Sequence, residues 1–299
     1  MNSSQYKKNE LKKFCATIGF KPSEVLSLIE NIDDYYREWS ETKVDKNTGE
    51  PKKYIDGTIK TRTICPAIKN LKLIQKRIKD KILNNIALPD CVHGGVKKKS
   101  NITNAKAHQG KKYQFTTDLQ DYYPNISSKQ VYETFVNLGF SPHFSHWLTC
   151  LTTYKHQLPQ GTSTSPHIAN IVFLSTDLKL IDFCKLNDIT YTRFVDDLTF
   201  SSSFDFKGKL NTILEIIIAG GFKISYRKTK YKGNQTITGV NVFLNKIDAP
   251  EKIKEKVKIE IETEAKVRPY SIYQNNILKT NKKKANHQHG IANNSGAWR

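Results

Sequence analysis

The sequence predicts an α+β fold in which an antiparallel sheet is backed by helices. Segments with the 3.6-residue periodicity of amphipathic helices alternate with short segments rich in Thr, Ile, Tyr and Phe that are bounded by turn residues. The strand-like segments occur as neighbouring pairs joined by tight turns, which is typical of hairpins rather than of the long crossovers of a parallel sheet. With 299 residues, the chain is long enough to bury a core without disulfides or a structural metal.

The predicted helices carry apolar residues at every third or fourth position and begin or end at capping or breaking residues. Ser127 and Gln130 form a capping box that opens one helix, and Gly220 with Gly221 ends another. The helix over residues 71–87 has an apolar stripe and a basic opposite face. In chain order, the predicted helices cover residues 9–18, 23–39, 71–87, 100–108, 127–139, a segment after Pro142, 164–186, 206–219 and 251–266.

The predicted strands are short segments rich in β-branched and aromatic residues. Residues 189–194 and 198–202 form a hairpin whose turn is residues 195–197, and another strand leads to Asp118. The turn chemistry of residues 45–49 precedes a further hairpin strand. In chain order, the predicted strands cover residues 54–64, 113–119, 189–194, 198–202, 222–226 and 236–244.

Charge is distributed unevenly along the chain. Lys and Arg number 48 against 28 Asp and Glu, and the resulting net charge of +20 attracts polyanions. Residues 52–112 and 251–299 are basic, whereas residues 113–205 hold nine acidic against five basic residues. Acids that hold cations between basic flanks that hold phosphates are what a metal-dependent nucleic-acid enzyme needs. A basic surface that serves only solubility is the alternative interpretation.

Nothing in the sequence predicts export or a membrane span. The longest apolar runs are far shorter than a membrane span, and residues 1–13 are polar and lysine-rich rather than a secretory signal. The five cysteines are odd in number and scattered, and they form no CxxC pair. We therefore expect reduced thiols and a cytoplasmic protein, not a disulfide framework or a zinc site.

Three aspartates are predicted to lie at strand ends. Asp118 ends one strand, and Asp196 with Asp197 occupies the tip of the hairpin over residues 189–202. Adjacent carboxylates repel each other when desolvated, unless they turn apart or share a cation. An Asp-rich turn without a function is the simpler interpretation of Asp196 and Asp197 alone. With Asp118 on a neighbouring strand, the three carboxylates predict a site where two Mg²⁺ ions support phosphoryl transfer.

Three segments resemble motifs A, B and C of reverse transcriptases. Residues 118–126 (DLQDYYPNI) resemble motif A, residues 158–166 (LPQGTSTSP) motif B, and residues 194–197 (FVDD) the YxDD box of motif C. Their joint occurrence in this order is highly specific. The resemblance implies an RNA-directed DNA polymerase, a nucleotidyltransferase with a right-hand fold of fingers, palm and thumb. It also makes the three aspartates the catalytic ligands of the two Mg²⁺ ions.

The resemblance implies roles for further residues in these motifs. Tyr123 becomes the aromatic gate that collides with a ribose 2′-hydroxyl and so favours dNTPs, whereas a core tyrosine is the alternative. Gln160 is expected beside the nucleotide sugar and the templating base pair, and Gly161 lets the backbone approach the substrate. Phe194 replaces the usual tyrosine of the YxDD box, and its ring is expected to keep the packing.

Basic residues outside these motifs are implied to bind the nucleotide. Arg62 lies in a segment similar to the fingers motif, and Lys99 occupies the place of a basic residue followed by serine. The family more often has arginine there, and lysine is a point charge rather than a bidentate fork. Lys228 matches the motif D lysine, a candidate acid for pyrophosphate departure. For Lys99 and Lys228, a solvated basic surface is the alternative.

Two further motifs are similar to those of retron reverse transcriptases. Residues 104–108 (NAKAH) match their NAxxH motif, and residues 237–239 (ITG) resemble their VTG motif. RNA-binding roles are thereby implied for Asn104, His108, Thr238 and Gly239. Such an enzyme copies part of its own structured noncoding RNA into multicopy single-stranded DNA, primed from an RNA 2′-hydroxyl, and yields an RNA–DNA hybrid. Retrons look like antiphage defence systems, so an effector protein is an expected partner.

The resemblance divides the chain into four parts. They are N-terminal helices over 1–45, fingers over 46–112, a palm with motifs A to E over 113–247, and a short thumb-like helix with a flexible basic tail over 248–299. The family ends in a helical thumb that grips RNA. Here residues 251–266 are clearly helical and residues 271–278 add a short helix, so we expect a thumb that is short or supplemented by a partner.

Two alternatives stay open. A group II intron-like or unclassified bacterial reverse transcriptase would not depend on Asn104, His108 and Thr238 for the choice of RNA. An RNA-binding scaffold that kept the fold without catalysis is the other alternative. The three aspartates and Gln160 speak against a scaffold, because it has no need of a costly acidic cluster.

Overall fold

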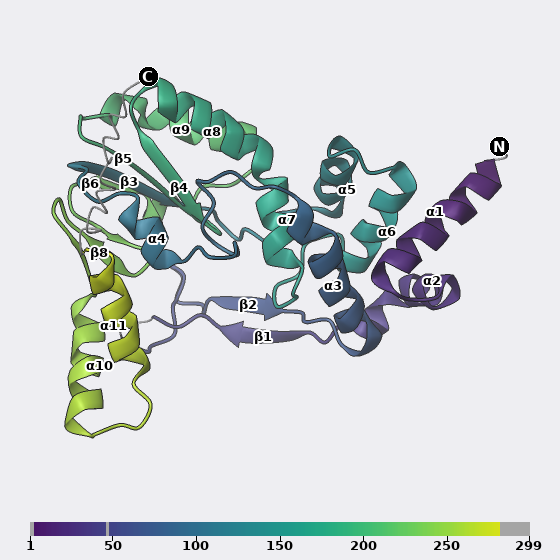
Figure 1. Ribbon diagram of the computed structural model, residues 1–299, viewed down its shortest axis with the longest axis horizontal. Coiled ribbons are helices and arrows are strands. Elements are labelled where there is room, and N and C mark those ends of the chain that lie inside the picture. The colour runs from purple at the N-terminus through teal and green to yellow at the C-terminus, as the bar shows by residue number, and fades with distance from the viewer. Residues whose placement is uncertain (1–2, 46–47, 282–299) are drawn as a thin grey trace, which may run out of the picture.

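Figure 1 shows the computed structural model, which describes residues 3–45 and 48–281. A four-stranded sheet lies at one end of the long axis and the N-terminal helices at the other. The helices are α1 (Ser3–Ile18), α2 (Pro22–Glu30), α3 (Lys69–Lys81), α4 (Asn101–Lys106), α5 (Ser128–Asn137), α6 (Pro142–Thr152), α7 (Ser165–Val172), α8 (Leu174–Leu186), α9 (Leu210–Ala219), α10 (Glu251–Glu262) and α11 (Pro269–Lys279). The strands are β1 (Trp39–Thr42), β2 (Thr61–Ile64), β3 (Tyr113–Asp118), β4 (Thr190–Phe194), β5 (Asp197–Ser202), β6 (Lys230–Lys232), β7 (Thr236–Ile237), β8 (Val240–Val242) and β9 (Ile247–Asp248).

The four-stranded sheet is antiparallel, in the order β4-β5-β3-β6, and successive side chains alternate between its two faces. On one face, Phe115 of β3 pairs with Phe200 of β5, and both rings belong to the main core. The helix α8 contacts β4, and α8 and α9 run above this sheet in the view of Figure 1. On the other face, Asp118 pairs with Asp197. The alternation therefore separates an apolar face that packs from a polar face that carries carboxylates.

A second, smaller core joins the C-terminal part of the chain to α4. The three-stranded sheet β7-β8-β9 contacts α4 and α11, and the helix pair α10–α11 projects from the rest of the molecule (Figure 1). The buried members of this core are Ala105, Ile237, Val240, Val242, Ile247, Ala249 and Ile277. The helix pair is thus attached to the four-stranded sheet through α4 and the short strands.

The predicted α+β class and the antiparallel sheet backed by helices are confirmed, but several elements differ from prediction. Only Thr61–Ile64 of the strand predicted over 54–64 forms β2, and the strand predicted over 236–244 is the hairpin of β7 and β8. The predicted helix over 23–39 ends at Glu30, and its last residue begins β1 instead. The predicted helix over 164–186 is two helices, because the chain changes direction at Phe173. The fully buried Phe173 ring packs against Phe222 at a centroid distance of 4.4 Å, a partner that periodicity does not reveal.

A further difference is the segment predicted as a strand over 222–226. There, only Ile224 forms a bridge, to Leu119, and the strand that follows is β6. At the C-terminus, the short helix predicted over 271–278 is present as α11, and 282–299, the end of the predicted basic tail, lies outside the described residues. The expected boundary after residue 45 falls between the paired strands β1 and β2.

Two simpler expectations concern thiols and membranes. All five cysteines are free thiols in the structure. Within the described ranges, no helix combines the length and the apolar character that a bilayer crossing requires.

Candidate active site

The strand ends bring two aspartates face to face. Asp118 is the last residue of β3 and pairs across the sheet with Asp197, the first residue of β5. Side chains that are directly opposed in antiparallel strands have Cβ atoms about 5 Å apart. Val195 and Asp196 form the turn between β4 and β5, and the Leu119 amide donates to the Asp196 carbonyl at 3.0 Å. The predicted hairpin and the neighbouring strand β3 together therefore bring the three aspartates to one end of the sheet.

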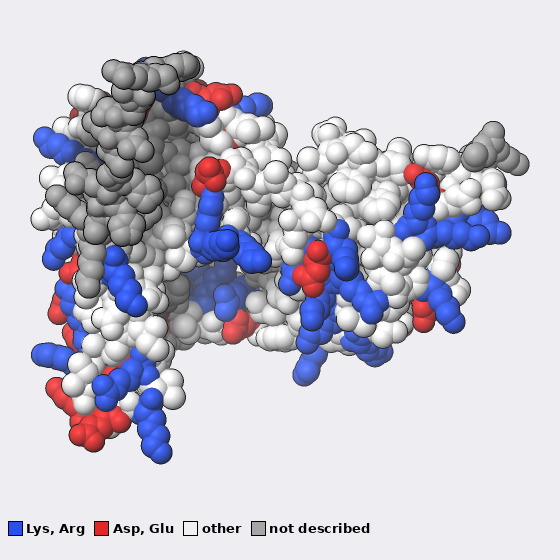
Figure 2. Space-filling view, in the orientation of Figure 1, with Lys and Arg blue, Asp and Glu red and all other residues white. Residues whose placement is uncertain are grey.

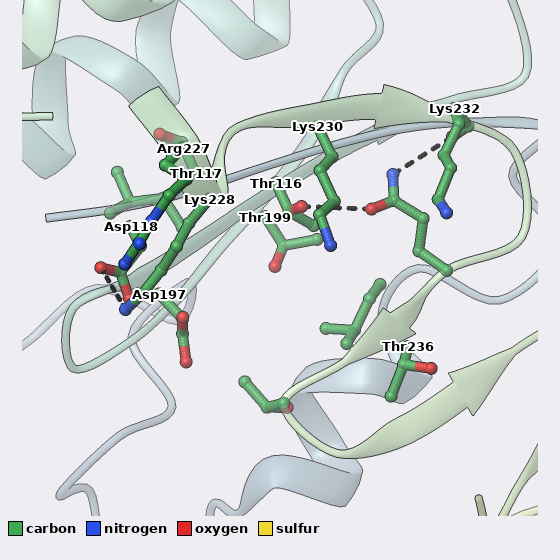
Figure 3. Close-up of a pocket in the computed structure, with 14 residues that line it drawn as sticks. Thr116, Thr117, Asp118, Asp197, Thr199, Arg227, Lys228, Lys230, Lys232 and Thr236 are labelled. Carbon is green, nitrogen blue, oxygen red and sulfur yellow. Dashed lines mark hydrogen bonds and ion pairs between the residues drawn. The ribbon is translucent and has the colours of Figure 1, made fainter. Parts of the chain in front are cut away.

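Asp118 and Asp197 lie in the wall of a pocket of about 360 Å³ (Figure 3). Strands β3 and β5 form one part of the wall, and the turn between β7 and β8 forms another. A row of cations completes it: Arg227, Lys228, Lys230 and Lys232. Such a wall can bind a phosphate-bearing ligand in two ways. The carboxylates can bind it through metal ions, and the Lys and Arg side chains can bind the phosphate directly.

The Lys228 ammonium sits on the first carboxylate. Its Nζ atom is 2.7 Å from Oδ1 of Asp118, and Figure 3 shows this side chain reaching down between the two acids. The pKa of the Asp197 carboxyl is raised to about 7, first by desolvation and then by the charges of Asp196 and Asp118, while Lys228 acts in the opposite direction. Asp197 nevertheless keeps solvent-exposed surface on the pocket side. The site therefore holds more negative charge than Lys228 alone compensates.

The chemistry of these donors fits magnesium, although the present side-chain arrangement is not a closed metal site. Carboxylate oxygens are the ligands that Mg²⁺ prefers. Desolvation and then the charges of Asp196 and Asp118 raise the pKa of Asp197, and a divalent cation would offset both effects. Among residues 3–45 and 48–281, however, no three His, Cys, Asp or Glu side chains are grouped so that they could hold a metal. In this structure the ammonium of Lys228 is the cation beside Asp118, and the role of the three carboxylates as metal ligands stays a prediction.

Tyr123 lies near the aspartate turn. Its side chain is half-buried, and its pKa is raised to about 12, first by burial and then by the charge of Asp196. The ring packs against Tyr122 at a centroid distance of 5.7 Å, and the Tyr122 hydroxyl donates to the Ala169 carbonyl at 2.7 Å. Tyr122 is thus the core tyrosine of this pair, and Tyr123 is the one with surface left to meet a ligand.

The segment that resembles motif B packs against the end of β2. The Cys65 amide donates to the Gln160 carbonyl at 2.7 Å. Gly161 has a φ of +100°, and a Cβ atom there would lie 3.0 Å from Cγ2 of Ile64. In this structure, glycine is therefore required by the backbone conformation and by the close approach to Ile64. Gln160 and Gly161 are not among the residues that line the pocket.

The two basic residues predicted upstream are engaged with acids of their own. Arg62 on β2 forms an ion pair with Glu41, its cross-strand partner on β1, at 2.6 Å. The Lys99 ammonium donates to the Asp90 carbonyl at 2.6 Å and lies 3.4 Å from the Asp90 carboxylate. Neither residue lines the pocket. Triphosphate binding by these two side chains therefore requires that they leave their present partners.

The two retron-like motifs meet in space, although they are more than 100 residues apart in the chain. The Asn104 amide donates to the Thr238 hydroxyl at 3.4 Å, and the neighbouring Asn101 donates to the Thr238 carbonyl at 3.0 Å. Thr238 and Gly239 both have positive φ angles, and they form the partly exposed turn between β7 and β8. The turn at residues 238–239 is thus held by α4.

His108 has a different environment, because its side chain is completely buried between α4 and the sheet. Its ring nitrogens bond to the hydroxyls of Ser201 and Thr192, both at 2.7 Å. Burial, followed by the nearby His93 and Lys111, lowers its pKa to about 3, so the ring is neutral. Asn104 is buried as well. Direct RNA contact by Asn104 and His108 does not fit this burial, whereas Thr238 and Gly239 are accessible.

The pocket also contains residues that sequence analysis did not single out. Gln235 donates to the Gln114 carbonyl at 2.7 Å and accepts from the Thr116 hydroxyl at 3.1 Å, which joins the β6–β7 connection to β3. Lys230 and Lys232 flank Tyr231, so both lysines point to the pocket side while the tyrosine points to the core (Figure 3). The Lys-Tyr-Lys alternation is the sequence signal that identifies this strand.

Basic side chains gather on the face that contains α3 (Figure 2). Lys72 and Lys76 are exposed and lie one turn apart on this helix, whose opposite face is buried through Leu71, Ile74 and Ile78. The predicted amphipathic basic helix therefore presents a cationic surface outside the pocket.

Comparison with known proteins identifies the family. Residues 46–242, which is more than half of the chain, match the family described as "Reverse transcriptase (RNA-dependent DNA polymerase)". The chain belongs to the reverse transcriptase family. This match confirms the right-hand polymerase fold that the motifs predict.

Curated relatives of this reverse transcriptase chain include retron enzymes. It is similar to the retron Se72 reverse transcriptase of Salmonella heidelberg, with 31% identity over 228 residues that cover 76% of this chain and 57% of the relative. It is also similar to the retron Ec86 reverse transcriptase of Escherichia coli, with 30% identity over 62% of this chain and 60% of the relative. These matches confirm the predicted retron resemblance, and the chain spans about three fifths of the length of these relatives.

A solved structure with a similar arrangement is that of telomerase from Candida albicans in complex with a fragment of telomeric RNA. The TM-score is 0.47 with 11% sequence identity, over 79% of this chain and 54% of the telomerase chain. The family assignment rests on the sequence matches and not on this structure.

Proposed function

We propose that this chain is an RNA-directed DNA polymerase of the retron type. The observation that carries the proposal is the cross-strand pairing of Asp118 with Asp197 at a pocket lined by four cations, in a chain of the reverse transcriptase family. Phosphoryl transfer depends mainly on positioning and on neutralising charge, and this pocket offers groups for both.

Asp118, Asp196 and Asp197 are the proposed ligands of two Mg²⁺ ions. When bound, these ions supply Lewis-acid activation of the attacking hydroxyl and stabilise the pyrophosphate leaving group. The Lys228 ammonium, which is paired with Asp118 in this structure, is the proposed proton donor toward the departing pyrophosphate, a role in which it would turn from Asp118 to the leaving group. Lys230 and Lys232 lie further along the same wall and stabilise phosphate charge.

Residues around the pocket are proposed to select and place the nucleotide. Tyr123, which keeps accessible surface beside the Asp196 turn, blocks a ribose 2′-hydroxyl. Gln160 and Gly161, which pack against the end of β2, are proposed to position the nucleotide. Arg62 and Lys99 are proposed to bind the triphosphate in exchange for their present partners Glu41 and Asp90. The division into N-terminal helices, fingers, palm and short thumb at the predicted boundaries is part of this proposal.

The RNA partner is proposed to be a structured noncoding RNA that is partly copied into multicopy single-stranded DNA from a 2′-hydroxyl primer. The similarity to the two named retron enzymes supports this. Within the chain, the exposed turn of Thr238 and Gly239 is the proposed RNA contact, and Asn104 and His108 hold that turn and α4 against the sheet. An effector protein, a role in antiphage defence and a cytoplasmic location belong to the same proposal.

DNA synthesis on the cognate RNA tests the proposal. Purified protein, the RNA encoded beside its gene, Mg²⁺ and labelled dNTPs should yield labelled cDNA attached to the RNA. Asp196→Asn combined with Asp197→Asn should abolish synthesis while the RNA is still bound. If the wild type binds the RNA but makes no labelled cDNA, the non-catalytic scaffold is favoured instead. Equal activity on unrelated RNAs would favour an unclassified reverse transcriptase.

A further inference from the structure

A buried arginine lies directly behind the aspartate turn. Arg193 on β4 has no exposed surface, and its side chain lies on the face of the sheet opposite to Asp118 and Asp197. Its Nε and Nη2 atoms donate to the two carboxylate oxygens of Asp177 on α8, at 3.0 and 2.6 Å. This bidentate pair fixes the plane of the guanidinium.

The remaining arm of the guanidinium reaches the turn itself. Nη1 donates to the Val195 carbonyl at 3.0 Å and to Oδ1 of Asn170 at 2.8 Å. The Val195 carbonyl belongs to the peptide unit that leads into Asp196. A group that holds this carbonyl therefore limits rotation of the peptide from which the acid extends.

The turn needs such a restraint. Val195 has a φ of +59°, a conformation that a β-branched residue avoids unless its surroundings impose it. Gly94 packs against the same turn, and a Cβ atom at residue 94 would lie 2.4 Å from the Val195 nitrogen. Asn170 closes the arrangement, because its Nδ2 donates to the Gly94 carbonyl at 2.8 Å while its Oδ1 accepts from Arg193.

Core stability alone does not account for this arrangement. A buried ion pair is weak evidence for stability, because the desolvation of both charges offsets their attraction. An Arg–Asp pair that only filled the core would need no third arm, yet this arm ends on the strained turn and on the residue that binds the Gly94 loop. The contacts therefore connect the helix α8, the loop at Gly94 and the aspartate turn through one guanidinium.

We propose that Arg193 is a positioning residue, which holds the left-handed turn at Val195 and thereby the backbone from which Asp196 and Asp197 extend. Asp177 fixes the guanidinium from α8, and Asn170 with Gly94 closes the other side of the turn. This inference rests on the proposed polymerase function for its kinetic consequences, but its structural claim is independent of that function.

Two variants disturb the turn by different routes. Arg193→Lys keeps the charge beside Asp177 and loses the planar fork. Gly94→Ala leaves every side chain of the ion pair intact and pushes on the Val195 backbone. Gly208→Ala is the matched control, because nothing lies within 4 Å of a Cβ atom at that position.

Three measurements are made on each full-length variant: steady-state dNTP incorporation, RNA affinity, and hydrogen exchange of the amides of residues 194–198. We expect both variants to lose about 10- to 100-fold in kcat, as removing support behind a ligand typically does. The KM for dNTP and the RNA affinity should stay within about twofold of the wild type, which is a small change in binding free energy, since a tenfold change corresponds to about 1.4 kcal/mol. Exchange at the turn should be faster, and exchange in α9 should be unchanged.

The outcomes separate the possibilities. Full kcat in folded Arg193→Lys and Gly94→Ala would overturn the positioning role. A parallel fall of kcat, RNA affinity and exchange protection throughout the protein would also overturn it, because that is the result of a merely structural pair. If Arg193→Lys does not fold, Gly94→Ala decides alone. If the wild type makes no DNA, the proposed function fails, and turn exchange in the variants still tests the restraint.

Discussion

The burial of His108 predicts a specific dependence of stability on pH. The pKa of this imidazole is lowered from 6.5 to about 3 because it is desolvated, so the folded state binds its proton less readily than the unfolded state. The stability that neutral His108 contributes is fully present above pH 6.5 and is lost as pH falls toward 3. At pH 5, which is 1.5 pH units below the unfolded pKa, this loss is about 2 kcal/mol of unfolding free energy.

The assay is urea-induced unfolding of the wild type and of His108→Gln at pH 8 and pH 5. Glutamine keeps a donor and an acceptor for the Ser201 and Thr192 hydroxyls but does not titrate. The wild type should lose about 2 kcal/mol more than the variant between the two pH values. His93, whose pKa is lowered to about 4 chiefly by burial, contributes to both proteins and cancels in the difference.

His146→Gln, a substitution at an exposed position of α6, is the control for replacing a histidine elsewhere. An identical pH dependence in the wild type and His108→Gln would refute the burial argument. RNA affinity at pH 8 provides a second reading. If His108 only holds α4 on the sheet, His108→Gln should bind RNA within about threefold of the wild type, a difference of less than 1 kcal/mol. A much larger loss of RNA affinity with unchanged stability would indicate that His108 contributes to RNA binding.

Three further predictions address the pocket and the basic surface. Lys228→Met should lower kcat for dNTP incorporation by about 100-fold, as loss of a general acid does, with RNA affinity unchanged, and wild-type kcat would exclude its proposed role. Gly161→Ala should destabilise the protein by about 1–2 kcal/mol in thermal unfolding, because residue 161 has a φ of +100° and a Cβ atom there would lie 3.0 Å from Ile64. Gly208→Ala is the control and should leave the stability unchanged. Equal destabilisation by the two substitutions would contradict the argument. Lys72→Gln combined with Lys76→Gln on α3 should reduce the slope of log RNA affinity against log salt concentration by roughly one per lost phosphate contact. The control pair, Lys179→Gln with Lys185→Gln on α8, should leave this slope unchanged. Identical slopes for the two double variants would exclude α3 from the RNA interface.

Much of the aspartate hairpin could be predicted because its signals are local. Strand alternation on both sides of residues 195–197 and the position of Asp118 at a strand end depend on near neighbours in the chain, and the structure has both. The helices with strong caps were also predicted well, as for Ser127 before α5. Local periodicity failed where a distant partner decides the conformation, as at Phe173, whose ring packs against Phe222.

The environments of the candidate site residues were harder to predict than the helices and strands. Motif resemblance identifies residue types, but it does not say which atoms are available in the folded chain. Asn104 and His108 are buried, and Arg62 and Lys99 are paired with Glu41 and Asp90, which no pattern in the sequence indicates. Their partners are chosen by tertiary packing and electrostatics together.

The amino-acid sequence alone determined the family, the alternation that makes a two-faced sheet, and the positions of the three acids. Only the tertiary structure decided that Lys228 lies on Asp118, that α4 supports the turn at residues 238–239, and that Arg193 reaches the Val195 carbonyl. The physical reason is that periodicity and motifs record interactions between near neighbours in the chain. The Lys228–Asp118 and α4–turn contacts join residues more than 100 positions apart, and the Arg193 contact depends on a guanidinium fixed from a separate helix, so they exist only after the chain has packed.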